Sequence, residues 1–112
     1  MNDISILETN LTKLQENVLI EINKTTNTPF IYKKLDIKPL TLTKTIQLLN
    51  QKGLLEDYNL TEKGKKMVHY LEFKNETISL FLNKYNIESN QEIESQLSKL
   101  DFKIIITLRN LL

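Results

Sequence analysis

The segment from Lys34 to Lys66 constrains the fold most, because its helix and turn signals follow one another in a tight order. A predicted helix opens at Pro39, where proline is tolerated because the first N–H groups of a helix have no partner within it. The helix closes at Gly53, since glycine readily adopts the left-handed conformation that ends many helices. Between these two positions apolar side chains recur at helical spacing, at Leu42, Ile46 and Leu49. The segment therefore predicts one well-bounded helix over residues 39–52. Its polar residues are expected to lie away from the buried stripe, namely Thr41, Lys44, Thr45, Gln47, Gln51 and Lys52.

The residues on either side of this helix predict a short companion helix and a small hairpin. Thr28 is the predicted N-cap of the companion helix, which stops near Leu35. Residues 54–56 and 58–60 are too short for anything but a two-stranded β-hairpin. Two helices joined by a short turn and followed by such a hairpin, or wing, are typical of a winged helix-turn-helix.

The N-terminal region carries two overlapping helix signals. Thr12 and Gln15 have the spacing of a capping box, in which each side chain satisfies a free backbone N–H. Further apolar residues alternate at spacings of three and four from upstream of this box, at Ile4, Leu7, Leu11, Leu14 and Val18. Either a short helix precedes Thr12 or one longer helix runs through it. The apolar seam packs inside this fold or its dimer, or else it forms an independent coiled coil.

The C-terminal half predicts further amphipathic helices. Residues 65–85 place apolar side chains on one helical face, at Met67, Leu71, Ile78, Phe81 and Leu82. Residues 86–89 interrupt this helix, and Ser89 with Glu92 forms another capping-box pattern. A last helical region runs to Leu112, with a bend predicted near Asp101.

The last ten residues, 103–112, hold more apolar side chains than one helical face can bury in a monomer of this size. Burial between two chains is therefore expected, and a two-fold dimer would present two reading helices to half-sites about one DNA turn apart. The predicted fold is mainly α with a small β-hairpin. It is one domain, 1–112, with the helix-turn-helix and short wing in 11–66 and dimerisation helices in 67–112.

Length and composition exclude several classes of protein. A chain of 112 residues suits a single core, and the lack of cysteine fits a reducing compartment. No apolar run approaches the roughly 20 residues of a membrane span, so we expect a soluble, cytoplasmic protein without a membrane partner. With two glycines, one histidine and no cysteine, the chain lacks a phosphate-binding loop and a nucleophile system, and we do not expect an enzyme.

Positive charge gathers around the predicted helix at 39–52. The whole chain has a net charge of +1, but residues 29–52 alone have +4, whereas residues 67–112 have −1. Lys38, Thr41, Lys44 and Gln47 are candidates for reading base edges of double-stranded DNA, and Leu40 could contact a thymine methyl group. Phosphate contacts are expected from Lys33, Lys34 and Lys52. The predicted tip of the wing, Glu56-Asp57, is acidic and would be repelled by phosphate.

The run from Leu60-Thr61-Glu62-Lys63-Gly64 to Phe81-Leu82 resembles the segment joining wing and dimerisation helix in the iron- and manganese-dependent, diphtheria-toxin-repressor-like regulators. That family reads L-T-x-x-G and then a long helix with R-H-x-x-x-E-x-F-L. Thr41-Leu42-Thr43-Lys44 is similar to its T-V-T-x recognition motif. The resemblance extends from about Leu11 to the C-terminus and implies a dimeric winged-helix DNA-binding regulator.

The family's metal ligands are not retained at the matching positions. Asn75 stands where the family has a metal-binding histidine, and Asn17 and Ile20 stand where it has an acidic pair. The lone His69 lies six residues from the matching place, and a transition-metal site needs several converging donors. We therefore expect neither a metal effector nor another cofactor.

Two functions remain open from the sequence. The first is a homodimeric DNA-binding transcriptional regulator that inserts the helix at 39–52 into the major groove. The alternative is a protein–protein interaction module on the same fold without specific DNA binding, which the modest net charge and the acidic wing favour.

Overall fold

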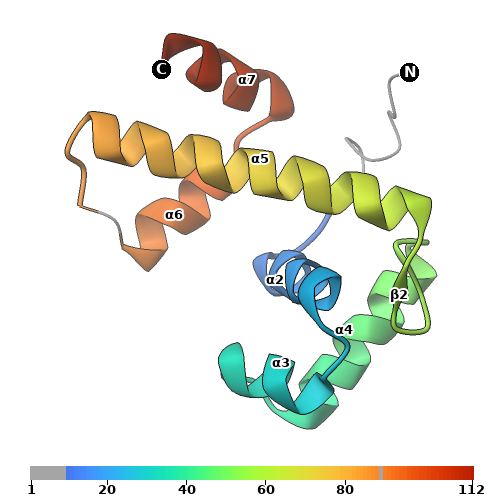
Figure 1. Ribbon diagram of the computed structural model, residues 1–112. Helices are drawn as coiled ribbons and strands as arrows, with labels where there is room; N and C mark the ends of the chain where they lie inside the picture. Colours follow the sequence, from blue (N-terminus) through green and yellow to red (C-terminus); the bar gives the residue numbers. More distant parts are fainter. Residues whose placement is uncertain (1–9, 89) are drawn as a thin grey trace. The chain divides into compact units, whose positions relative to one another are not determined.

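The computed structural model describes residues 10–88 and 90–112, and within them it has six helices and one hairpin. The helices are α2 (Lys13–Lys24), α3 (Thr28–Lys34), α4 (Pro39–Gln51), α5 (Glu62–Lys84), α6 (Gln91–Ser98) and α7 (Phe102–Leu111). The strands β1 (Leu55–Glu56) and β2 (Asn59–Leu60) pair antiparallel between α4 and α5 (Figure 1). The predicted class, mainly α with a small β-hairpin, is confirmed. The chain forms two compact units, the first ending at His69 and the second running over Tyr70–Leu112.

The helix starts follow the predicted capping signals, with two shifts of one residue. Gln15 donates its N–H to Thr12 Oγ1 at 3.1 Å and accepts from the Thr12 N–H at 3.1 Å, so the capping box is formed. The N-cap of α3 is Asn27, not the predicted Thr28, because the Asn27 side chain accepts from the backbone N–H of Phe30. Asn90 caps α6 in the same way, one residue after the predicted position. Asparagine competes well with threonine and serine as an N-cap.

Two parts of these predictions lie outside the described residues. They are Ser89 and the upstream part of the apolar seam, Ile4 and Leu7.

Three helices end in the same motif, with one residue in the left-handed conformation. These residues are Asp36, Gly53 and Asn86, with φ of 55°, 75° and 51°. At the end of α4, Gly53 N–H donates to Asn50 O at 3.0 Å and Leu54 N–H donates to Leu49 O at 3.1 Å. This pair of bonds satisfies carbonyls that the helix leaves free. The prediction of a helix end at Gly53 is confirmed.

The core of the first unit lies where α2, α3 and α4 contact one another. Its buried apolar residues in these helices are Val18, Leu19, Ile22, Ile31, Leu42, Ile46 and Leu49. The buried stripe predicted for α4 is confirmed, with one correction. Thr45, expected to lie away from this stripe, is buried, and its hydroxyl donates to Thr41 O at 2.8 Å. That internal bond removes most of the cost of burying the hydroxyl.

The Leu60–Gly64 motif holds the hairpin and α5 together. Thr61 Oγ1 donates to Gly53 O at 2.6 Å and accepts from the backbone N–H of Gly64 at 3.0 Å. A Cβ on Gly64 would lie 2.0 Å from Leu54 O, which is far inside van der Waals contact. The threonine at position 61 and the glycine at position 64 are therefore both explained by local packing between the end of α4 and the start of α5.

The second unit packs α6 and α7 against the C-terminal part of α5. Ile78, Leu82 and Ile105 are buried at its centre. Partly buried apolar side chains surround them, namely Phe73, Phe81, Ile93, Leu97 and Leu100. The bend predicted near Asp101 is a full break between α6 and α7, with Asp101 as the N-cap of α7.

Polar contacts fasten the same elements of the second unit. Lys74 Nζ donates to Ser98 O at the end of α6, and Lys84 Nζ donates to Leu111 O at the end of α7. A cation at the C-terminal end of a helix also interacts favourably with the negative end of the helix dipole. No helix in the described parts of the chain has both the length and the apolar character needed to cross a bilayer.

Candidate nucleic-acid interface

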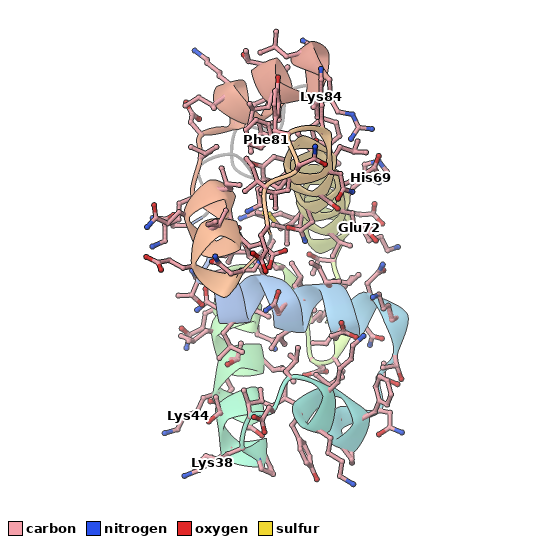
Figure 2. The ribbon with its side chains drawn as sticks, turned by 90° about the vertical axis from the view of Figure 1, so that its left-hand side faces the viewer. Lys38, Lys44, His69, Glu72, Phe81 and Lys84 are labelled. Carbon is pink, nitrogen blue, oxygen red and sulfur yellow. The ribbon has the colours of Figure 1, made fainter. Side chains whose placement is uncertain are left out.

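The outward face of α4 gathers most of the residues predicted to read DNA. Lys38 is the N-cap of the helix, and Leu40, Lys44 and Gln47 follow on its exposed side. Figure 2 shows the Lys38 and Lys44 side chains extending from α4 toward the same side. Thr41 lies at the edge of this face and is half-buried. The packing of Leu42, Ile46 and Leu49 on the opposite side fixes which residues face outward.

Exposed positive charge lies toward the N-terminal end of α4. Lys38 makes no side-chain cap hydrogen bond, and the first turn holds no acidic residue. The free N–H groups of that turn therefore add to the charge of Lys38 and Lys44. Within residues 10–88 and 90–112, neither ammonium group has a hydrogen-bond or ion-pair partner. This end of the helix can accept an anion without breaking an existing contact.

Apolar side chains flank the lysines on the same face. Leu40 is 63% exposed and Leu48 is 43% exposed. Leu40 was identified from the sequence as a contact residue, whereas Leu48 was not, because it does not belong to the buried stripe of Leu42, Ile46 and Leu49. Its position four residues after Lys44 was the available signal, because residues four apart share a helical face.

Two of the three predicted phosphate-binding lysines already have partners inside the chain. Lys34 Nζ lies 3.0 Å from Glu21 Oε1. Lys52, half-buried at the C-terminal end of α4, donates to the Asn10 carbonyl and to Gln15 Oε1. Lys33 is exposed in the last turn of α3 and has no such partner among the described residues. The structure thus leaves Lys33 as the predicted phosphate ligand without a competing contact.

The hairpin is fixed to α4 and is acidic at its turn. The Asn50 side chain accepts from the backbone N–H of Asp57 at 2.8 Å and donates to Asp57 O at 3.1 Å. The turn itself is Asp57-Tyr58, one residue later than the predicted tip. Glu56, Asp57 and Tyr58 are all exposed, so the hairpin offers carboxylates and one aromatic ring.

The residues at the family's metal-ligand positions do not form a cluster of ligands in the described parts of the chain. In the described ranges, no three histidine or acidic side chains lie close enough together to hold a metal ion. Asn17, Ile20 and Asn75 are each half-buried, and His69 is exposed on α5 (Figure 2). His69 and Glu72 project from the same helix, one turn apart.

Comparisons with models of protein families, with curated proteins and with solved structures found no match. The resemblance drawn from the Leu60–Gly64 motif therefore stays a prediction.

Proposed function

We propose that this chain is a homodimeric DNA-binding regulator with a winged helix-turn-helix, in which α3 and α4 form the helix-turn-helix and the β1–β2 hairpin is the wing. The observation that carries the proposal is the outward face of α4, where Lys38, Leu40 and Lys44 are exposed beside an uncapped helix N-terminus. A helix in the major groove reads bases from its N-terminal residues. Lys38 and Lys44 supply donors for base edges or phosphates, and Leu40 supplies an apolar contact for a thymine methyl group.

In this proposal, only some of the charged residues contact DNA. Lys33, Lys38 and Lys44 bring positive charge to the phosphates, whereas the acidic turn at Asp57 keeps the hairpin away from the backbone. Lys34 and Lys52 hold parts of the fold together through the contacts described above. DNA affinity therefore depends on few cations, which fits the net charge of +1 for the whole chain.

The dimer is proposed to form through α7. Ile105 points into the second unit, but Ile104 is 46% exposed and Leu111 is 66% exposed. These two residues and the partly buried Leu108 recur at spacings of four and three, which places them on one face of the helix. A second copy would bury this face, and two-fold symmetry would present two α4 helices to two half-sites. We propose no catalytic role and no metal effector.

Selection from a pool of random duplexes, followed by affinity measurements on the selected site, tests the proposal. With Lys33, Lys38 and Lys44 from each of two protomers at the DNA, the logarithm of the affinity should fall with the logarithm of salt concentration with a slope of about −5. Absence of binding to duplex DNA even at low salt would contradict the proposal.

The alternative is a protein-interaction module, and one observation favours it. Leu40 and Leu48 leave an apolar surface on α4, and interface centres are richer in such side chains than in lysine. In that case a stable protein partner should co-purify. Charge reversal at Lys38 or Lys44 should then leave the cellular role unchanged.

A further inference from the structure

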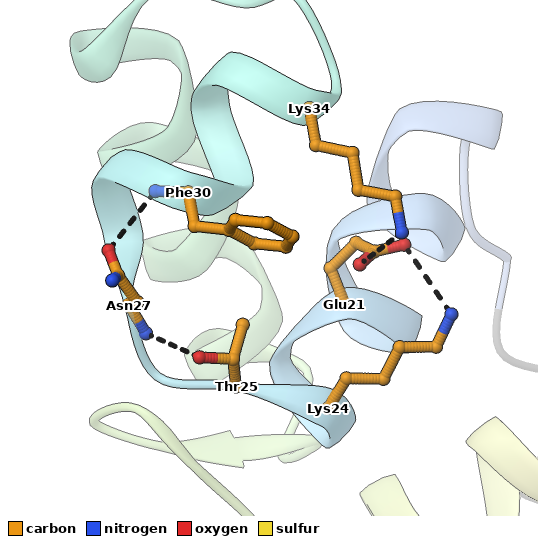
Figure 3. Close-up of a pocket in the computed structure, with 6 residues that line it drawn as sticks. All are labelled: Glu21, Lys24, Thr25, Asn27, Phe30 and Lys34. Carbon is orange, nitrogen blue, oxygen red and sulfur yellow. Dashed lines mark hydrogen bonds and ion pairs between the residues drawn. The ribbon is translucent and has the colours of Figure 1, made fainter.

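An open cavity of about 360 Å³ lies in the first unit, between the end of α2, the connection to α3, and α3 itself (Figure 3). Its lining residues are Glu21, Lys24, Thr25, Asn27, Phe30 and Lys34. The volume falls in the lower range of cavities that hold small organic ligands. Apart from Lys34, no residue of this lining was identified as a candidate from the sequence.

The electrostatics of the cavity favour an anion. One carboxylate, Glu21, faces two ammonium groups, with Lys34 Nζ at 3.0 Å from Oε1 and Lys24 Nζ at 3.8 Å from Oε2. The cavity lining therefore has a net charge of +1. The 3.8 Å separation is too long for a hydrogen bond, so Lys24 keeps donor capacity for another acceptor. Both lysine side chains are about half exposed, whereas that of Glu21 is only 8% exposed.

The remaining polar groups of the lining leave few acceptors free. Thr25 Oγ1 accepts from the Asn27 N–H at 3.1 Å, and Asn27 Oδ1 accepts from the Phe30 N–H at 3.1 Å. The threonine hydroxyl and the two ammonium groups can still donate. A ligand in this cavity therefore meets donors, as a carboxylate requires.

The aromatic wall adds a second requirement. The Phe30 residue is 52% exposed although it is large and apolar, and its ring is directed into the cavity in Figure 3. Lys34 Nζ lies 6.0 Å from the ring centroid, at the limit of a cation–π contact. A flat aromatic ligand would cover part of this exposed ring, and offset stacking of two rings is favourable beyond the area buried.

We propose that this cavity binds a small aromatic carboxylate. The ligand ring stacks on Phe30, and the ligand carboxylate accepts hydrogen bonds from Lys24 and Lys34 beside Glu21. The Phe30 ring and the two lysines are needed together to select aromatic carboxylates, since inorganic anions lack a ring to stack on Phe30 and neutral aromatic molecules lack a charge to pair with the lysines.

A ligand in this cavity should also affect DNA binding, an expectation that rests on the proposed function. Lys34 belongs both to the cavity and to the last turn of α3, next to Lys33. A bound carboxylate neutralises the net charge of +1 of the cavity lining. The ligand should therefore weaken DNA binding, which gives the protein an effector site without metal.

Titration of the whole chain with benzoate, followed by amide chemical shifts in two-dimensional proton–nitrogen NMR, tests the cavity. Benzamide has the ring without the charge, and cyclohexanecarboxylate has the charge without the aromatic ring. We expect saturable shifts at residues 21–34 with benzoate and weaker binding of both analogues. Phe30→Leu and Lys24→Gln should each weaken benzoate binding, whereas Glu21→Gln should strengthen it by removing the competing carboxylate.

Lys13→Gln is the matched control, because Lys13 lies on the same helix and also faces an acidic residue, Glu16, three positions later at 3.8 Å. Its benzoate affinity should equal that of the unaltered chain. Three outcomes would overturn the proposal. They are no saturable shift, equal competition by inorganic phosphate, or equal losses in Lys13→Gln and Lys24→Gln. DNA affinity is measured separately with and without benzoate, so a chain that ignores DNA refutes the proposed function and leaves the cavity result standing.

Discussion

At the scale of single residues, the two glycines of this chain are required for different physical reasons. Gly53 is needed for its φ of 75° at the end of α4, and nothing lies within 4 Å of the place a Cβ would take. Gly64 has no positive φ, but a Cβ there would lie 2.0 Å from Leu54 O. Gly53 is therefore required by the backbone conformation, whereas Gly64 is required because there is no space for a side chain.

Alanine substitutions separate these two reasons. Gly53→Ala should lower the free energy of unfolding by about 1 kcal/mol, the cost of a left-handed alanine. Gly64→Ala should cost more, about 3 kcal/mol or above, because backbone atoms must move apart. Urea unfolding of both variants checks this order. Equal losses would mean that the end of α4 and the start of α5 are less closely packed than described.

Lysine pairing was the least predictable property at this scale. The Thr12–Gln15 capping box could be predicted because its two residues are only three positions apart. Lys52 could not, since its partner Gln15 is 37 positions away and meets it only after α2 and α4 pack. Thr45 was misplaced for a different, local reason. Its hydroxyl finds an acceptor inside its own helix, which permits burial.

At the scale of elements, Arg109 joins α7 to α5. Its guanidinium donates to Glu76 Oε1 at 2.7 Å and to Thr77 Oγ1 at 3.4 Å, and it lies 5.3 Å from the centroid of the Phe73 ring. Glu76 is mostly exposed, so its ion pair with Arg109 should contribute little. The Thr77 and Phe73 contacts lie closer to the buried side of α5 and should carry more of the effect.

Arg109→Met, which keeps the apolar stem, should lower the free energy of unfolding by about 1–2 kcal/mol. Glu76→Gln keeps an acceptor and should cost less than about 0.5 kcal/mol. Thermal unfolding of the pair compares the two contributions. If Glu76→Gln were as damaging as Arg109→Met, the exposed ion pair would be the main contact.

The boundaries of the elements were mostly readable from the sequence, because prolines, glycines and capping residues act locally. The end of α4 just before Gly53 and the hairpin over residues 55–60 are examples. The shifts to Asn27 and Asn90 arose where two good N-cap residues adjoin each other, and only the backbone conformation selects one. In the candidate site, the outward residues of α4 followed from its buried stripe. The cavity beside Phe30 did not, since no sequence pattern indicates an unfilled space.

At the scale of the whole molecule, the proposed dimer depends on the exposed face of α7. Ile104→Lys combined with Leu111→Lys should convert the dimer into monomers, because two lysines would be buried against a second copy. Leu40→Lys makes the same chemical change at a comparably exposed leucine of α4 and should leave the dimer intact. Sedimentation velocity measures the state of each variant. Dimers that persist in the double variant would place the interface elsewhere.

Whether α4 reads DNA is decided by comparing the affinities of Lys44→Gln and Lys65→Gln for the selected duplex. Both changes remove one positive charge, and the ion pair of Lys65 with Glu62 is exposed on both sides, so losing it costs little. We predict that Lys44→Gln weakens binding by about tenfold or more and lowers the magnitude of the salt slope, while Lys65→Gln changes neither. Equal effects of the two substitutions would contradict the claim, because affinity would then depend on net charge and not on this face of α4.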